Sequence, residues 1–528
     1  MEKYSAPLLH DLPPSTKSDD ENPPTLRLRP SLDHAIEQCV GTMGTAQLFQ
    51  AFIISIAWIF DAQQTFISVF VDRTPDWHCT NTTDDTNYAP CSTTANTFCA
   101  FPQSSWSWDE ASYVSTVSEW NLECYGGGSI NVAGFPASAF FAGCLFGGIL
   151  LATLGDSTLG RKKMLCFTSL AMSAIGIVTA FSPNVWIYTF LRFLTGFARA
   201  TIGTSALVLA VEIVGSKWRG QVSILGFFLF TFGFISLPGI AYATEGSTWR
   251  SLYLWTSLPA FGYSVLIFFF VHESPRWLLV RGRREEAIQI LKTMGSSNGH
   301  SLTMSFYNLV ISDDVGDSES AAVGDLYSAL KVLVGSRWAS RRLAAAMTVA
   351  FGVGLLYYGI PLGVGHLDFN LYLIVTFNAI SELPSLLLTL LYVDRLNRRS
   401  TMLMLTTASG AASLACVFVT NTLVQMMIEV SAFFGTITAF NLMLIYTLEL
   451  FPTCVRNSAV AMVRQALVLG GVFSPMLIAI GRTQGIFWSF GMFGFVIGSC
   501  GLFTVCLPET RGTDICDTMD EQELCNKI

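Results

Sequence analysis

Long apolar runs separated by short polar segments dominate the chain. About twelve of these runs reach roughly 20 residues, the length that crosses the hydrocarbon core of a bilayer. They lie near 46–71, 131–154, 164–182, 185–210, 221–243, 249–271, 343–363, 369–392, 402–420, 422–447, 458–481 and 484–507. The pattern therefore predicts twelve transmembrane helices.

The composition supports a membrane protein. Only 13% of the 528 residues are charged and 51% are hydrophobic, against roughly 25% charged in soluble domains. We therefore expect contact with membrane lipid. The net charge of -8 lies mostly in the tails and the long loops, which gives no sign of nucleic-acid binding. Residues 1–44 are too polar for a cleavable signal peptide and predict a disordered tail.

Basic clusters predict the orientation. They follow the even-numbered helices, at 161–163, Lys217 and Arg219, Arg276 to Arg284, 395–399 and Arg456. Because lysine and arginine are enriched in short cytoplasmic loops, both termini should lie in the cytosol. The expected organisation is a cytosolic tail (1–44), a first bundle (45–271), a cytosolic loop (272–342), a second bundle (343–507) and a cytosolic tail (508–528).

The loop at 72–130 should then face the exoplasmic side. It holds four cysteines and the sequon that begins at Asn81, so we expect glycosylation there. The cysteines are Cys79, Cys91, Cys99 and Cys124. Four cysteines in an oxidising compartment predict two disulfides, with three pairings open. The other cysteines are predicted to be reduced, and no spacing indicates a metal site or a cofactor.

Two polar segments repeat each other across six helices. GDSTLGRKK at 155–163 follows the second helix, and VDRLNRRS at 393–400 follows the eighth. Each has an acid followed by bases, at matched positions. A general enrichment of bases in cytoplasmic turns explains the positive charges but not the matched acid. The repeat predicts an all-α membrane protein with twelve transmembrane helices in two pseudo-symmetric six-helix bundles, as in many transporters.

These motifs resemble a known family. GDSTLGRKK is similar to the signature of the major facilitator superfamily, and ESPRWLL (273–279), ELFPTCVRN (449–457) and LPETRG (507–512) resemble motifs of sugar porters and organic ion transporters. SEWNLEC (118–124) resembles the organic cation/carnitine transporters, and FDAQQTFISVF (60–70) and VRQALVLGGVFSP (463–475) resemble their plant members. The resemblance implies the major facilitator fold and transport by alternating access.

Charges at the cytoplasmic helix ends form a predicted gate. They are Asp156, Arg161, Glu212, Arg219, Asp394, Arg398, Glu449 and Arg456. The resemblance implies that such networks hold the two halves together on the cytoplasmic side while the carrier is open outward. The alternative is that these charges only set the topology.

Charges inside the predicted helices point to function, because burying them in a bilayer is costly. Arg192 and Arg199 are two turns apart and should share a face, with Asp61 as a candidate partner. Glu382 precedes Pro384 in SELP, which resembles the Glu-x-Pro of cation-binding family members. We expect Glu382, with Asp61, to bind a positively charged nitrogen. The alternative is that each acid is paired with an arginine for structure.

Arg464 extends this prediction to zwitterions. The family pattern places an acid or an arginine seven residues before the proline of helix 11, where this chain has Val468. Arg464 lies one turn away and suits a carboxylate, unless it neutralises Glu382 or Glu449. Tyr357 and Tyr358 are candidate cation-π partners. Carnitine-like quaternary ammonium compounds, choline and polyamines are the expected substrates.

Other classes of function are alternatives to an organic cation carrier. No nucleophile-base, HExxH or Walker A pattern indicates an enzyme or ATP-driven transport. A sugar-porter-like carrier and a non-transporting membrane sensor are the alternatives. Either proton coupling through Asp61 or Glu382 or the membrane potential can drive uptake, and we expect a monomer. EKYSAPLLHD at 2–11 resembles an acidic dileucine signal, which favours the vacuolar membrane over the plasma membrane.

Overall fold

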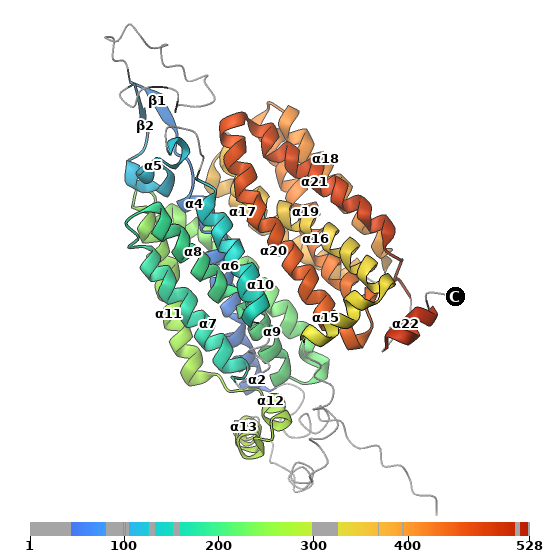
Figure 1. The fold of residues 1–528 in the computed structure, drawn as a ribbon. Coiled ribbons are helices and arrows are strands. Elements are labelled where there is room, and N and C mark those ends of the chain that lie inside the picture. The colour runs from blue at the N-terminus through green and yellow to red at the C-terminus, as the bar shows by residue number, and fades with distance from the viewer. Residues whose placement is uncertain are drawn as a thin grey trace, which may run out of the picture.

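The computed structural model describes residues 44–80, 99, 101, 105–125, 132–151, 159–297, 326–367, 369–392, 395–512 and 518–525. Asn81, Cys91, Asp156 and Asp394, which the sequence singled out, lie outside the described residues. Within the described ranges the chain is mostly helical, and the helices form two bundles that stand side by side (Figure 1).

The first bundle holds six spans. They are α2 (Thr45–Ser55) with α3 (Ala57–Phe66) and α4 (Ser68–Val71), then α6 (Phe135–Leu151), α7 (Arg161–Thr179), α8 (Val185–Arg199) with α9 (Ile202–Ile213), α10 (Arg219–Ala243) and α11 (Trp249–Phe270). The second bundle holds α16 (Arg337–Gly363), α17 (Leu371–Tyr392), α18 (Arg398–Phe418), α19 (Thr422–Leu450), α20 (Thr453–Gln484) and a last span of η8 (Ile486–Trp488), α21 (Phe490–Leu502) and η9 (Phe503–Cys506).

The number of spans agrees with the sequence pattern. In the described part of the chain, 11 helical spans are long and apolar enough to cross a membrane. The twelfth is α6, a shorter apolar helix of 17 residues that ends where the description stops. The predicted class, a membrane protein of twelve helices, is confirmed.

Smaller elements lie outside the bundles. The predicted exoplasmic loop contains an antiparallel pair, β1 (Trp77–Cys79) and β2 (Trp106–Trp108), followed by η2 (Ser112–Val114), α5 (Thr116–Trp120) and η3 (Leu122–Cys124). The predicted cytosolic loop contains α12 (Pro275–Val280), α13 (Arg284–Ser297) and α15 (Leu326–Gly335), and α22 (Met519–Cys525) lies in the C-terminal tail. The seventh span begins at Arg337, earlier than the apolar run, because its first turns are polar.

Local signals explain where several helices begin. The side chains of Asn184 and Asn421 accept hydrogen bonds from backbone N–H groups three residues later, at 3.0 and 3.1 Å, and so cap α8 and α19. Ser274 caps α12 in the same way, and Pro275 follows it at a position where a missing N–H costs nothing. The asparagines also mark where the chain turns back into the membrane.

The bundles meet along two helix pairs, α6 with α20 and α10 with α17. Close approach requires small residues at such contacts. At Gly134, just before α6, an added Cβ would lie 2.6 Å from the carbonyl oxygen of Pro475 in α20. The residues that face the interface between these pairs are therefore the ones that a substrate between the halves would meet.

Candidate functional site

Glu382 lies at the interface between the two bundles. It is only 4% exposed. Its Oε2 accepts a hydrogen bond from the Thr231 hydroxyl of α10 at 2.9 Å, and its Oε1 accepts one from the Tyr357 hydroxyl of α16 at 3.1 Å. Both partners are neutral, and no cation among the described residues pairs with this carboxylate. The site therefore combines a buried acid with contacts from both halves of the molecule.

Aromatic rings surround Tyr357, one of the two hydrogen-bond partners of Glu382. The Tyr357 ring stacks on Phe433 of α19 with centroids 5.8 Å apart, and Phe440 lies at 4.9 Å. Phe66 of α3 packs edge-on against the same ring at 6.1 Å. Aromatic faces close to a carboxylate are the chemistry that recognises a quaternary ammonium group, which has no hydrogen-bond donor of its own.

Asp61 has a partner of the opposite charge. Arg199 donates two hydrogen bonds to it, from Nε to Oδ1 and from Nη2 to Oδ2, each 2.8 Å long. Asp61 is 3% exposed, so the pair forms a buried bidentate contact. The sequence analysis gave two roles for Asp61, cation binding and a structural pair with an arginine. The structure shows the pair with an arginine.

Arg192 and Arg199 share a face of α8, as predicted. Their guanidinium groups lie 4.2 and 5.8 Å from the ring centroid of Phe140. Arg192 is fully buried, and its Nη2 donates to the Ser68 hydroxyl at 3.0 Å. Asp61 therefore pairs with only one of the two arginines, and the other is held by an aromatic ring and a hydroxyl.

Tyr358 and Arg464 lie on the other side of the Asp61–Arg199 pair. The Tyr358 ring packs against Phe141 of α6 with centroids 4.6 Å apart. Arg464 lies within electrostatic range of Tyr358 and of the Asp61–Arg199 pair. In the residues that the structure describes, Arg464 forms no ion pair with Glu382 or Glu449, the alternative that the sequence left open.

The predicted cytoplasmic end of the first bundle has an ion pair and a helix cap. Arg161 Nε lies 3.6 Å from Glu212 Oε2. Glu273, from the ESPRWLL motif, accepts the backbone N–H groups of Arg161 and Lys162 at 3.0 Å each. A carboxylate at this place satisfies free donors at the start of α7 and complements the helix dipole.

The second bundle repeats this arrangement. Arg398 donates to Glu449 from Nη2 at 2.9 Å and from Nε at 3.1 Å. Glu509, from the LPETRG motif, accepts the backbone N–H groups of Arg398 and Arg399 at 2.8 and 3.1 Å. The sequence identified both motifs but missed the capping role of their acids, although the signal was present in the glutamate that follows both the sixth and the twelfth helix, Glu273 and Glu509.

The other predicted gate residues lie at the same level. Arg219 begins α10, and Arg456 in the first turn of α20 donates to the Phe451 carbonyl at 3.3 Å. The described pairs, Arg161–Glu212 and Arg398–Glu449, each lie within one bundle.

On the predicted exoplasmic side a contact joins the two halves. Arg482, near the end of α20, donates to the backbone carbonyl of Asp72 at 3.3 and 3.4 Å and lies 3.8 Å from the Glu123 carboxylate. Asp72 follows α4 and Glu123 lies in η3, so both belong to the first half. The sequence analysis did not identify Arg482, because it lies at the edge of an apolar run.

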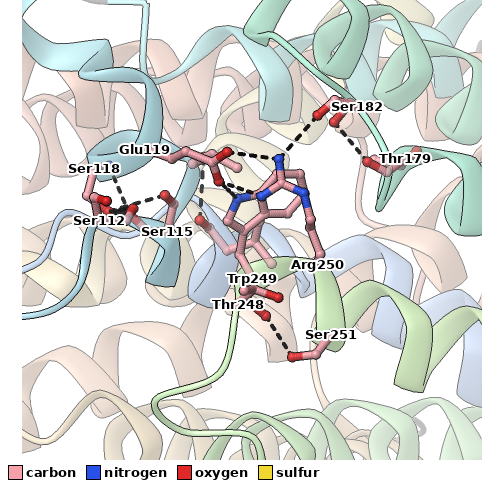
Figure 2. Close-up of polar contacts among 12 residues, drawn as sticks. Ser112, Ser115, Ser118, Glu119, Thr179, Ser182, Thr248, Trp249, Arg250 and Ser251 are labelled. Carbon is pink, nitrogen blue, oxygen red and sulfur yellow. Dashed lines mark hydrogen bonds and ion pairs between the residues drawn. The ribbon is translucent and has the colours of Figure 1, made fainter.

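The predicted exoplasmic loop is also attached to the first bundle (Figure 2). Glu119 of α5 accepts hydrogen bonds from the Trp249 indole at 2.6 Å and from Arg250 Nη2 at 2.8 Å, at the start of α11. Burial alone would raise the pKa of Glu119, but these hydrogen bonds and the Arg250 charge outweigh it and hold the pKa below its ordinary value. We call this contact the Glu119 clamp.

Disulfides lie in the same loop. The structure places Cys99 and Cys124 in one disulfide, and Cys79 is also disulfide-bonded. The bond at Cys124 fastens η3, the element that carries Glu123, to the more distant part of the loop.

Two bundles of six helices with matched charge networks define a class of protein, the membrane carriers of the major facilitator type. A family model described as Major Facilitator Superfamily matches residues 107–475. The inward-open structure of the xylose transporter XylE from E. coli covers 90% of this chain and 98% of its own, with a TM-score of 0.61 at 16% identity. That likeness shows the fold.

Sequence comparisons narrow the class. The chain is 52% identical to Organic cation/carnitine transporter 3 of Arabidopsis thaliana over 525 residues, 99% of this chain and 98% of that protein. It is also 52% identical to Organic cation/carnitine transporter 2 of Arabidopsis thaliana (93% and 94% covered), and 28% identical to Solute carrier family 22 member 3 of Rattus norvegicus (87% and 82%). The chain belongs to the organic cation/carnitine transporter family of the major facilitator superfamily.

Proposed function

We propose that this protein moves organic cations or zwitterions, such as carnitine-like quaternary ammonium compounds, choline and polyamines, across a membrane by alternating access. The observation that carries the proposal is Glu382, a buried carboxylate between the two bundles that has only hydroxyl partners. A cation entering this site gains a full charge interaction in a medium of low dielectric constant, which neither Thr231 nor Tyr357 provides.

Arg464 gives the proposed site a positive charge in addition to the negative charge of Glu382. A zwitterion would place its ammonium group at Glu382, against the Tyr357 ring, and its carboxylate toward Arg464. Tyr358 lies next to Tyr357 in α16 and within electrostatic range of Arg464, so the two tyrosines would line the path between the two charges. The Asp61–Arg199 pair would form a neutral part of the wall, and its separation on proton binding would provide a route to proton coupling.

The ion pairs support alternating access. In the described residues, Arg482 connects the bundles on the predicted exoplasmic side. A contact of this kind would close that side, as one of the two states of alternating access requires. In the opposite state we expect the cytoplasmic charges to pair across the bundles and the Arg482 contacts to break.

The proposal also covers the membrane in which the protein lies, its oligomeric state and its covalent modifications. We place the protein in the vacuolar membrane on the strength of the acidic dileucine motif at Leu8 and Leu9, with the plasma membrane as the alternative. We further propose that it acts as a monomer, that Asn81 is glycosylated and that the exoplasmic cysteines are oxidised. A fluorescent fusion carrying Leu8→Ala and Leu9→Ala should move to the plasma membrane, and an unchanged location would contradict the sorting signal.

Uptake of radiolabelled carnitine, choline and a polyamine into proteoliposomes tests the transport activity. We expect saturable uptake that Glu382→Gln reduces to background, because the neutral amide keeps the hydrogen bonds but has no charge for the cation. Glu286→Gln, which neutralises an exposed acid on α13, is the matched control and should transport normally. Normal cation uptake by the Glu382→Gln protein would contradict the assignment of the site.

A further inference from the structure

A second buried acid in the second bundle has no part in the site described above. Glu429 of α19 is fully buried. Its Oε1 accepts a hydrogen bond of 2.8 Å from the Nδ2 group of Asn378 in α17. Its other oxygen, Oε2, has no hydrogen-bond partner among the described residues, and neither has the Oδ1 atom of Asn378. Two hydrogen-bonded side chains thus leave two oxygens unsatisfied.

A single proton on Glu429 would satisfy both of these oxygens. An ionised carboxylate only accepts hydrogen bonds, as does the oxygen of an amide, so neither atom can serve the other. A protonated carboxyl group carries one O–H donor. If Glu429 holds a proton on Oε2, that O–H can donate to Asn378 Oδ1 while Nδ2 donates to Oε1. One proton then satisfies both oxygens, as buried polar groups require.

The surroundings also favour the neutral acid. No charged side chain among the described residues compensates Glu429, in contrast to Asp61. The titratable group within electrostatic range is the Cys416 thiol of α18, and Asn378 faces it from α17. Neither brings a positive charge. An isolated carboxylate in such a place is far more costly than a hydrogen-bonded neutral acid.

Asn378 connects this acid to the interface between the bundles. It lies four residues before Glu382 on α17, one helical turn away on the same face. A change in the hydrogen bonding of Asn378 therefore acts on the turn that positions Glu382. Glu429 lies two turns from the exoplasmic start of α19, so opening on that side would bring water to it first.

We propose that Glu429, together with Asn378, forms a proton-binding site whose occupancy is linked to cation binding at Glu382. The step is the addition of one proton from water to the carboxylate, with no other bond formed or broken. The proposal that Glu429 binds a proton does not depend on which substrate the protein transports. The proposed link to Glu382 rests on the proposed function.

Infrared spectroscopy of the purified full-length protein tests the proton directly. We expect a carbonyl band of a protonated carboxylic acid that is lost in Glu429→Gln, a variant of the same shape that can make both hydrogen bonds with Asn378. Glu286→Gln should keep the band. Asn378→Leu is a second variant, in which the acid remains but the band shifts to higher frequency because its hydrogen bonds are lost. A spectrum in which neither variant changes the band overturns the site.

Transport in proteoliposomes tests the link. With one coupled proton, the accumulation of choline should change by up to about tenfold per unit of pH difference across the membrane. The Glu429→Gln protein should still transport choline but lose this dependence. A variant that keeps the dependence overturns the link, whatever the infrared result. If the wild-type protein shows no uptake, the proposed function and the link both fail, and the infrared band still decides whether Glu429 holds a proton.

Discussion

Asp61 in the first bundle and two glutamates in the second have opposite kinds of partner. In the first bundle Asp61 receives two hydrogen bonds of 2.8 Å from Arg199, so its charge is compensated within the protein. In the second bundle Glu382 and Glu429 are buried to a similar extent but contact only hydroxyl or amide groups. A compensated acid stabilises its own bundle, and an uncompensated one is left to bind a cation or a proton from outside.

The difference follows from the cost of burying charge. Removing an ion from water costs several kcal/mol, and a partner charge with good geometry offsets most of that. The first bundle supplies this partner on α8. The second bundle has Arg464 on α20, but that arginine forms no ion pair with either glutamate in the part of the chain described. Substitutions that neutralise one acid at a time should show whether the two bundles differ as this reasoning requires.

The largest effect should follow from Asp61→Asn. It leaves the Arg199 charge buried without its partner, and breaking a buried ion pair costs about 3–5 kcal/mol. Thermal unfolding of the purified protein should detect this loss. The double variant Asp61→Asn with Arg199→Gln removes both charges and should recover most of the stability. A single variant as stable as the wild type would mean that Arg199 is compensated elsewhere.

Arg464→Gln should have the next largest effect. If the guanidinium group binds the substrate carboxylate, its loss removes a charge-assisted hydrogen bond worth about 1.5–3 kcal/mol. The KM for carnitine should then rise by roughly 10- to 100-fold, while the KM for choline, which has no carboxylate, stays unchanged. Competition assays in proteoliposomes measure both values. An equal change for the two substrates would assign Arg464 to structure instead.

Glu382→Gln should change stability far less than Asp61→Asn. The glutamine can still accept from one hydroxyl through its oxygen, and its NH2 group can donate to the other, so both contacts survive. No buried cation loses its partner. We expect the free energy of unfolding to stay within about 1 kcal/mol of the wild type, measured in the same thermal assay. A loss as large as that of Asp61→Asn would remove the contrast between the bundles.

The sequence predicted the fold more completely than the site. Apolar length and basic loops determine spans and orientation, and both are local properties of the chain. Glu382 and Arg464 also stand out, because charges are rare in apolar runs. The partner of each charge is set by how helices pack, so the Asp61–Arg199 pair could be suggested but not decided. Glu429 lies in an equally apolar helix but resembles no motif, and its significance comes only from the unsatisfied oxygens around it.

The Glu119 clamp provides a partly exposed reference for the buried Asp61 pair. The side chains of Arg250 and Glu119 are 29% and 25% exposed, so their pair should contribute only about 0.2–1 kcal/mol. A double-mutant cycle with Glu119→Gln and Arg250→Gln measures this coupling. A coupling as large as that expected for Asp61 and Arg199 would show that burial is not what separates the two pairs.

The pH dependence of the clamp has a definite sign. Because the pKa of Glu119 is lowered in the folded protein, the clamp contributes fully above the ordinary value of 4.5 and is lost as the pH falls through the lower folded value. The difference in melting temperature between wild type and Glu119→Gln should therefore be constant from neutral pH down to about 4.5, decrease between this value and the lower folded pKa, and disappear below the folded pKa. A difference that fades at higher pH would mean that Arg250 does not hold the carboxylate ionised. A mildly acidic exoplasmic compartment would accordingly leave the loop fastened to α11 while Glu429 responds to the proton.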